Sequence, residues 1–300
     1  MFNVKSINSE LENRIIAAIA ILPSILILLI LLALPTLTVI IFSLQDVRMG
    51  ESEYPYVGID NFTWALLYPE FWRAFVNTLI WVFGSVTMEM IIGLGIALML
   101  NKNFIGRGLA RAIIFAPYLI PTVVAVLVWR YMFHDILGVI NYFLINLGLI
   151  ESPINWLSNT KTAMITVIIV AVWKFFPFVV LALLGALQSI PQDQYEAARI
   201  DGASEWQQFW FITLPHLMPI FLLTALLRSI WTFHKFDIIY LLTGGGPVGS
   251  TMTLPILIYH KGFADYELGR ASALSLITAF LLTLLLALYF FLSKKVEERQ

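Results

Sequence analysis

Residues 196–215 read EAARIDGASEWQQFWFITLP and lie between two long apolar runs. The stretch begins at Glu196, has Gly202 near its middle and ends at Pro215. Its first part is polar and helix-forming, and its second part is rich in aromatic residues. Between membrane segments, this pattern indicates a docking surface for another protein. A helix that only lies at the lipid interface would also be amphipathic, and this alternative stays open.

The composition is typical of a membrane protein. Of the 300 residues, 60% are hydrophobic and 12% are charged, whereas soluble domains carry about 25% charged residues. The net charge of −1 provides no basic surface for nucleic acid. The chain has no cysteine, which excludes disulfides and cysteine-based metal sites.

Six apolar runs are long enough to cross a bilayer, which takes roughly 20 residues per helix. Lipid offers no partner for free backbone groups, so each run is expected to be helical. The sequence therefore predicts an all-α polytopic integral membrane protein, in which residues 1–300 form a single transmembrane domain. The six expected spans are 15–44, 72–100, 109–133, 162–187, 215–242 and 269–292.

The distribution of Lys and Arg predicts the orientation, because these residues gather on the cytoplasmic side. The loop 101–111 and both ends of the chain are basic, whereas the loop 45–71 is acidic. With six spans, the three basic regions lie on one side, so both termini and the segment 188–214 are predicted to be cytoplasmic. The terminal residues behind this prediction are Lys5, Arg14, Lys294, Lys295 and Arg299.

The spacing of Glu196-Ala197-Ala198, Gly202 and Ile212-x-Leu214-Pro215 resembles the coupling loop of permease subunits of binding-protein-dependent ABC importers. Segments 77–79, 117–121 and 241–247 resemble the carbohydrate group of these permeases. The resemblance implies the type I importer architecture and a multi-pass position in the cell membrane. It also implies that loop 188–214 binds the ATPase through Glu196, Ala197, Ala198, Asp201, Gly202, Ile212, Leu214 and Pro215.

The same resemblance implies partners and a division of labour. The partners are a second homologous permease, two ABC ATPase subunits and an extracytoplasmic solute-binding protein that delivers a sugar. ATP and Mg belong to the ATPase, so this chain has no cofactor or catalytic residue of its own. In agreement, segment 244–251 has the spacing of a phosphate loop, but Ser250 stands where the essential Lys is required. The four histidines lie in separate segments, so no metal site is predicted.

Charged residues within the spans are costly and usually functional. Thr224, Arg228, Trp231 and Lys235 follow helical spacing and form one stripe on the fifth span. A face that combines an aromatic ring with hydrogen-bond donors suits a sugar, and the resemblance implicates the same region. The predicted substrate pathway consists of Asn77, Trp173, Lys174, Arg228, Trp231, Thr232, His234 and Lys235.

Other interpretations of these charges stay open. An ion pair between Glu89 and Lys174 would merely hold helices together. A cationic lining also fits a phosphorylated or acidic glycoside instead of a neutral sugar. A secondary transporter would use Glu89 and Asp237 as proton relays, although no inverted repeat is evident in the sequence. A membrane-embedded enzyme would need clustered His, Asp or Ser residues, which the sequence does not show.

Overall fold

The computed structural model describes the backbone of residues 4–297 and the side chains of residues 15–287, 289 and 291. This described part of the chain is almost entirely helical and contains no β-strand. The terminal basic side chains that support the predicted orientation lie outside the described residues. They are Lys5, Arg14, Lys294, Lys295 and Arg299.

The chain divides into two compact units. One combines Met1–Leu67 with Lys261–Ile277, and the other combines Tyr68–His260 with Thr278–Gln300. The long helix α14 (Leu268–Glu297) contributes residues to both units. A single transmembrane domain over residues 1–300 therefore stays a prediction.

In the first unit, one apolar helical run is followed by a short helix that a buried amide holds in place. The run comprises α1 (Val4–Leu28), η1 (Leu29–Ala33) and α2 (Leu34–Ser43), and the short helix is α3 (Asp60–Leu67). Asn61 Nδ2 donates to the carbonyl oxygens of Ser43 and Gln45, at 3.0 and 2.9 Å. The bond to Ser43 satisfies a carbonyl that the end of α2 leaves without a helical partner.

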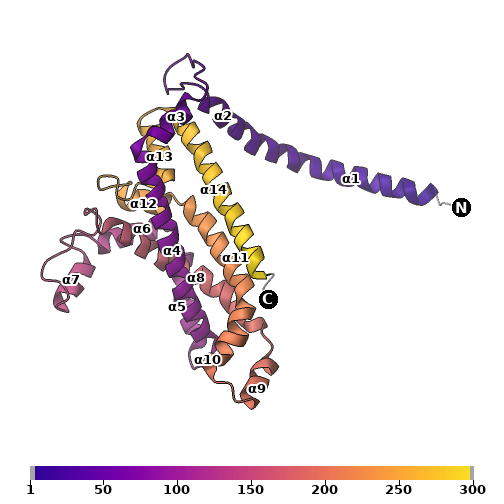
Figure 1. Ribbon diagram of the computed structural model, residues 1–300, viewed down its shortest axis with the longest axis vertical. Helices are drawn as coiled ribbons and strands as arrows, with labels where there is room; N and C mark the ends of the chain where they lie inside the picture. Colours follow the sequence, from indigo (N-terminus) through magenta and orange to yellow (C-terminus); the bar gives the residue numbers. More distant parts are fainter. Residues whose placement is uncertain (1–3, 298–300) are drawn as a thin grey trace. The chain divides into compact units, whose positions relative to one another are not determined.

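In the second unit, three long helices lie side by side (Figure 1). They are α4 (Pro69–Asn101), α8 (Ala163–Ser189) and α11 (Leu214–Phe233). Small residues allow close packing between the first two. Gly93 of α4 faces Val179 of α8 so closely that an added Cβ would lie 2.5 Å from a Val179 methyl carbon.

The third expected span, 109–133, is not one continuous helix. It consists of α5 (Arg107–Leu119) and α6 (Thr122–Met132), which meet at 96°. Ile120 is extended because a residue that precedes proline is disfavoured in the helical region, and Pro121 also lacks an amide proton. The sequence predicted one span over 109–133 and did not predict this break.

The fifth expected span, 215–242, begins and ends earlier than predicted. Helical structure runs from Glu205 to Phe233 through α10 (Glu205–Gln208), η2 (Phe209–Thr213) and α11. Asp237 starts a separate helix, α12 (Asp237–Thr243), where its carboxylate accepts the amide of Ile238. The remaining elements are α7 (Val139–Asn146), α9 (Gln192–Ile200), α13 (Leu254–Tyr259) and η3 (His260–Ala264).

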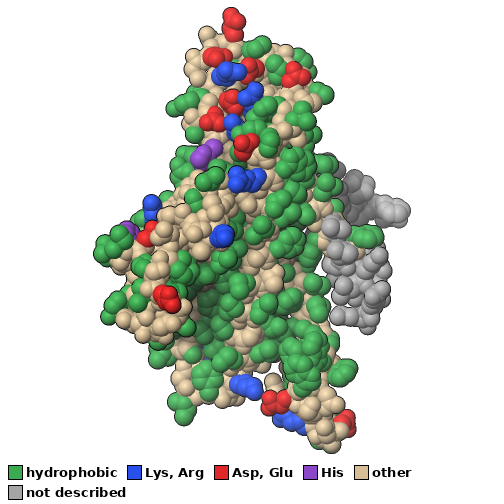
Figure 2. Space-filling model, turned by 60° about the vertical axis from the view of Figure 1, so that its left-hand side comes forward, with side chains coloured by type: hydrophobic (Ala, Val, Ile, Leu, Met, Phe, Trp, Pro, Cys, Tyr) green, Lys and Arg blue, Asp and Glu red, His purple; other side chains and the backbone are tan. Residues whose placement is uncertain are grey.

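The described helices suit a lipid environment. Five of them are long and apolar enough to span a membrane, and the bent α5–α6 pair brings the number to six if it counts as one span. Hydrophobic side chains cover a large part of the face drawn in Figure 2. Such a surface would be unusual for a protein in water, because soluble monomers rarely expose large contiguous apolar patches.

The close contact of α4 with α8 gives a first prediction. Gly93→Ala forces a methyl group against Val179 and is expected to destabilise the protein by about 1–3 kcal/mol, the usual cost of overpacking. Gly95→Ala is the matched control on the same helix, because no atom lies within 4 Å of the added Cβ. Thermal unfolding of both purified variants in detergent, followed by tryptophan fluorescence, measures the difference. Equal melting temperatures for the two variants would contradict the predicted contact.

Candidate functional site

A cavity of about 470 Å³ lies among α5, α8 and the end of α11. This volume is within the range of small-molecule sites, about 300–1,000 Å³. The lining residues are Tyr118, Phe175, Arg228, Trp231, Thr232, His234 and Lys235. The cavity thus combines aromatic rings from several helices with hydrogen-bonding groups from the end of one.

The aromatic wall of the cavity is a connected cluster. Phe178 lies edge-on to Trp231, with ring centroids 5.1 Å apart, and its ring centroid is 6.1 Å from that of Tyr118. Tyr118 also lies edge-on to Phe175 at 6.5 Å. Trp231 keeps 44% of its surface exposed, so its ring is available to a ligand.

Both strongly basic side chains at the cavity already have a carboxylate partner. Arg228 Nε and Nη2 donate to the two oxygens of Glu89, at 2.6 and 2.9 Å, and both residues are buried. Lys235 pairs with Asp237 at 3.3 Å. The Phe175 ring lies beneath both cations, 4.5 Å from Arg228 Cζ and 5.0 Å from Lys235 Nζ. The cavity therefore has cation-rich walls whose charge is largely compensated.

Five of the eight predicted pathway residues line this cavity, and three do not. Asn77 instead donates to the carbonyls of Gly249 and Met252, both at 2.9 Å, and holds the loop after α12. Trp173 lies edge-on to Trp129 at 5.3 Å. Lys174 is buried against backbone carbonyls of the α5–α6 break.

Two details of the sequence interpretation are wrong. Glu89 pairs with Arg228, so the considered pair of Glu89 with Lys174 does not form. Lys235 lies beyond the end of α11 at Phe233, so the predicted stripe does not continue on one helix. Lys235 still lines the cavity, because the chain turns after Phe233.

Sequence reasoning missed two lining residues, Tyr118 and Phe175. Tyr118 lies within the Pro-Tyr-Leu-Ile-Pro segment, whose only signal in the sequence is its resemblance to the carbohydrate group of permeases. Phe175 follows Trp173 and Lys174 in an apolar run without a distinguishing pattern. Its place at the cavity depends on how α8 packs against α11, which the sequence does not specify.

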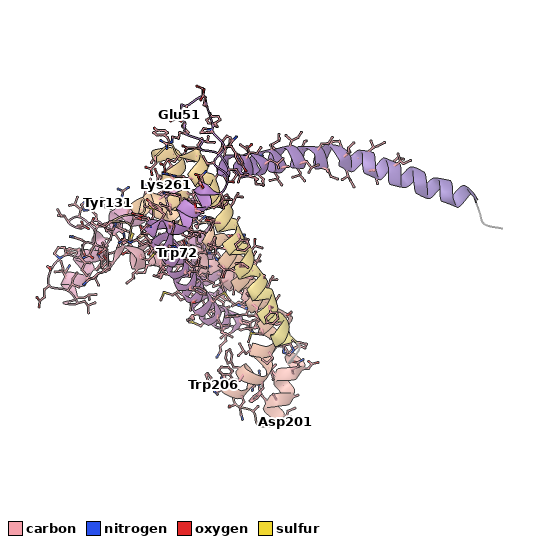
Figure 3. All side chains as sticks on the ribbon, turned by 45° about the horizontal axis from the view of Figure 1, so that its top comes forward. Glu51, Trp72, Tyr131, Asp201, Trp206 and Lys261 are labelled. Atoms are coloured by element: carbon pink, nitrogen blue, oxygen red, sulfur yellow. The ribbon has the colours of Figure 1, made fainter. Side chains whose placement is uncertain are left out.

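The coupling segment, as we name residues 188–215 for their resemblance to a coupling loop, contains two short helices joined by a turn. Helix α9 ends at Ile200, and Gly202 adopts a φ of +81°, a conformation that favours glycine. Ser204 then caps α10 in a reciprocal capping box with Gln207. In Figure 3, Asp201, which follows α9, and Trp206 of α10 are labelled at the same end of this unit.

The coupling segment offers exposed groups on one side and an anchor on the other. Glu196 and Ala197 of α9 are exposed. On the inner side, the hydroxyls of Tyr195 and Thr213 are hydrogen-bonded at 2.9 Å and join α9 to η2. The segment lies at the end of its unit away from α12 and α13 (Figure 1). Among the described residues, no group of three His, Asp or Glu side chains is placed to hold a metal ion.

The chain is similar to known transport proteins. Residues 89–299 match the family described as the binding-protein-dependent transport system inner membrane component. The chain is 41% identical to the trehalose/maltose transport system permease protein MalF of Thermococcus litoralis, over 86% of each protein. It is 31% identical to the sulfoquinovosyl glycerol transport system permease protein SmoG of Agrobacterium fabrum, over 89% of this chain and 87% of that protein.

A solved structure has the same fold. It belongs to a bacterial ABC transporter involved in the import of the acidic polysaccharide alginate. Its TM-score with this chain is 0.84 at 23% identity, and the match covers 97% of this chain and 99% of that one.

The buried ion pair gives a second prediction. Glu89→Ala leaves Arg228 buried without its carboxylate, which is expected to cost about 3–5 kcal/mol of stability. The control is Lys102→Ala, which breaks a pair whose side chains are 74% and 89% exposed and should change stability little. Chemical denaturation in detergent compares the two, and a double variant, Glu89→Leu with Arg228→Met, should recover most of the loss. If Glu89→Ala is as stable as Lys102→Ala, the pair does not hold α4 to α11.

Proposed function

The chain belongs to the family of binding-protein-dependent transport system inner membrane components, and from this premise we propose that it is the permease subunit of an ATP-driven importer of a neutral saccharide. The observation that supports the substrate class is the cavity, where an aromatic wall faces cations that already hold carboxylate partners. Like its permease relatives, the chain is a transport subunit and not an enzyme.

The cavity suits a sugar because its two kinds of group match the two surfaces of a pyranose ring. The rings of Trp231 and Tyr118 offer flat apolar faces, and Thr232, His234 and Lys235 offer hydrogen-bonding groups for hydroxyls. A phosphorylated or acidic glycoside would require a cation to leave Glu89 or Asp237. For the buried Arg228 this exchange is costly, because it leaves Glu89 as an unpaired buried charge. A neutral sugar requires no such exchange.

We assign energy coupling to the exposed side of the coupling segment. A partner ATPase, which carries ATP and Mg, contacts α9 through Glu196, Ala197 and Ala198. Alanine allows close approach of the partner, and the carboxylate offers a pair to a basic group. A second homologous permease completes the membrane pore, and two ATPase subunits lie below it. In this arrangement both termini and residues 188–214 face the cytoplasm.

Transport then proceeds by alternating access. A loaded solute-binding protein docks on the outer face, and ATP binding draws the two ATPase subunits together. The coupling segments follow, the spans open outward and the cavity receives the sugar. Hydrolysis returns the spans to the inward-open state. The permease thus makes one conformational equilibrium respond to ligands on both sides of the membrane.

The experiment that tests this proposal measures ATP hydrolysis by the complete complex in proteoliposomes. Candidate binding proteins are added with maltose, with trehalose, with an acidic disaccharide or without sugar. Stimulation by a binding protein loaded with a neutral sugar is expected. If only the binding protein loaded with the acidic disaccharide stimulates ATP hydrolysis, the proposal of a neutral saccharide substrate is overturned. Sugar uptake that needs an ion gradient but no ATP would identify a secondary transporter instead.

The coupling segment gives a third prediction. Glu196→Lys reverses the charge offered to the ATPase, and Gly202→Pro forces a φ of +81° toward about −65°. Both variants are expected to abolish sugar uptake while the amount of chain in the membrane stays normal. Gln194→Lys adds a positive charge on another side of the same helix and should leave uptake intact. Uptake assays with immunoblots of membrane fractions measure both quantities, and normal uptake by Glu196→Lys would remove the docking argument.

A further inference from the structure

The break between α5 and α6 leaves backbone carbonyls without their helical donors. In a continuous helix the carbonyl of Pro117 would accept the amide of residue 121, but Pro121 has none. The chain turns by 96° at this point, so Tyr118 and Ile120 also lose the regular pattern. Within a bilayer each unsatisfied backbone group costs several kcal/mol, so a broken helix is tolerated only where protein groups or a water-filled cavity supply new partners. The carbonyls at this break therefore need other donors.

One side chain of α8 supplies these donors. Lys174 Nζ donates to the carbonyl oxygens of Pro117 at 3.1 Å and Tyr118 at 3.2 Å, and also to that of Ile120. An ammonium group has three N–H donors, one for each of the three carbonyls. Lys174 is only 3% exposed, and its charge lies at the carboxyl end of α5, where the helix dipole favours a cation.

The break is connected to the cavity through Tyr118. The Tyr118 carbonyl is held by Lys174, and its ring contacts Phe175 and Phe178 at the cavity wall. Phe175 follows Lys174 in sequence, so the same turn of α8 holds both the backbone and the ring of this tyrosine. A shift of the break would therefore move Tyr118 relative to Trp231, which lies across Phe178.

We infer that Lys174 is a positioning residue, which caps the open carbonyls of the α5–α6 break and thereby fixes Tyr118 at the cavity. It touches no substrate itself. The role at the break stands on geometry alone, whereas the consequence for sugar transport rests on the proposed function. The two parts are therefore tested with separate measurements.

The first measurement follows the geometry of the break and needs no sugar. The chain has no native cysteine, so Ile113→Cys on α5 and Val124→Cys on α6 provide two unique, exposed positions for spin labels. Pulsed electron paramagnetic resonance on the complete complex gives the distance between the labels. Lys174→Met, which keeps the length of the side chain but has no donors, is expected to broaden the distance distribution. Lys174→Arg, which keeps charge and donors, should largely preserve it.

The second measurement counts sugar molecules transported per ATP hydrolysed. Lys174→Met is expected to lower this ratio at least about tenfold, because the loss of even one of its three charge-assisted hydrogen bonds corresponds to about that factor, while ATP hydrolysis per complex persists. Tyr118→Ala should lower the ratio similarly, and the double variant should be no worse than either alone, because both act on one unit. Lys161→Met, at an exposed lysine before α8, should match the parent protein.

Each outcome decides part of the inference. An unchanged distance distribution in Lys174→Met overturns the role at the break. A changed distribution with a normal transport ratio overturns the role in positioning Tyr118. Equal losses of ATP hydrolysis and transport would mark a general folding defect and overturn the inference as well. If the parent complex transports no sugar, the proposed function fails, and the distance measurement still decides the role of Lys174.

Discussion

The helical core depends on how its buried charges are satisfied. A charge moved out of water costs many kcal/mol unless it is paired or hydrogen-bonded. In this protein, Glu89 ties α4 to α11 through Arg228, and Lys174 ties α8 to the broken third span. The Phe175 ring lies near both cations, 4.5 Å from Arg228 Cζ and 5.8 Å from Lys174 Nζ. The positions of four segments are thus fixed by two polar contacts and the aromatic ring between them, and the cavity forms beside the same groups.

The spans could be predicted from the sequence because the length of an apolar run is a local property. Their interruptions were harder to predict. Pro121 gave a local signal for a break, but prolines also occur in continuous membrane helices, so the outcome depended on a donor from elsewhere. That donor is Lys174, more than fifty residues away in the chain. The early end of α11 at Phe233 likewise reflects the separate helix that begins at Asp237.

In the candidate site, too, some features follow from local sequence and others depend on contacts between distant segments. Arg228, Trp231 and Thr232 could be predicted because they share one helix and its spacing. Tyr118 and Phe175 could not, because their place at the cavity depends on packing between helices. The partner of Glu89 was also unpredictable, since both Lys174 and Arg228 are cations within spans. Sequence alone showed that these charges were costly, and only the structure showed which contact satisfies each one.

The helix from Glu205 to Phe233 is what relates the two functional regions. It begins within the coupling segment and ends at the cavity. At about 1.5 Å per residue, Glu205 and Trp231 lie roughly 40 Å apart along this helical segment, which includes the π-helical turn η2 and the prolines Pro215 and Pro219. The hydrogen bond between the hydroxyls of Tyr195 and Thr213 joins α9 to this helical segment within η2. In the proposed importer, a displacement of α9 by the ATPase is therefore passed along this helical segment toward Arg228 and Trp231. The Arg228–Glu89 pair then ties α4 to the same movement, because separating the two buried charges is costly.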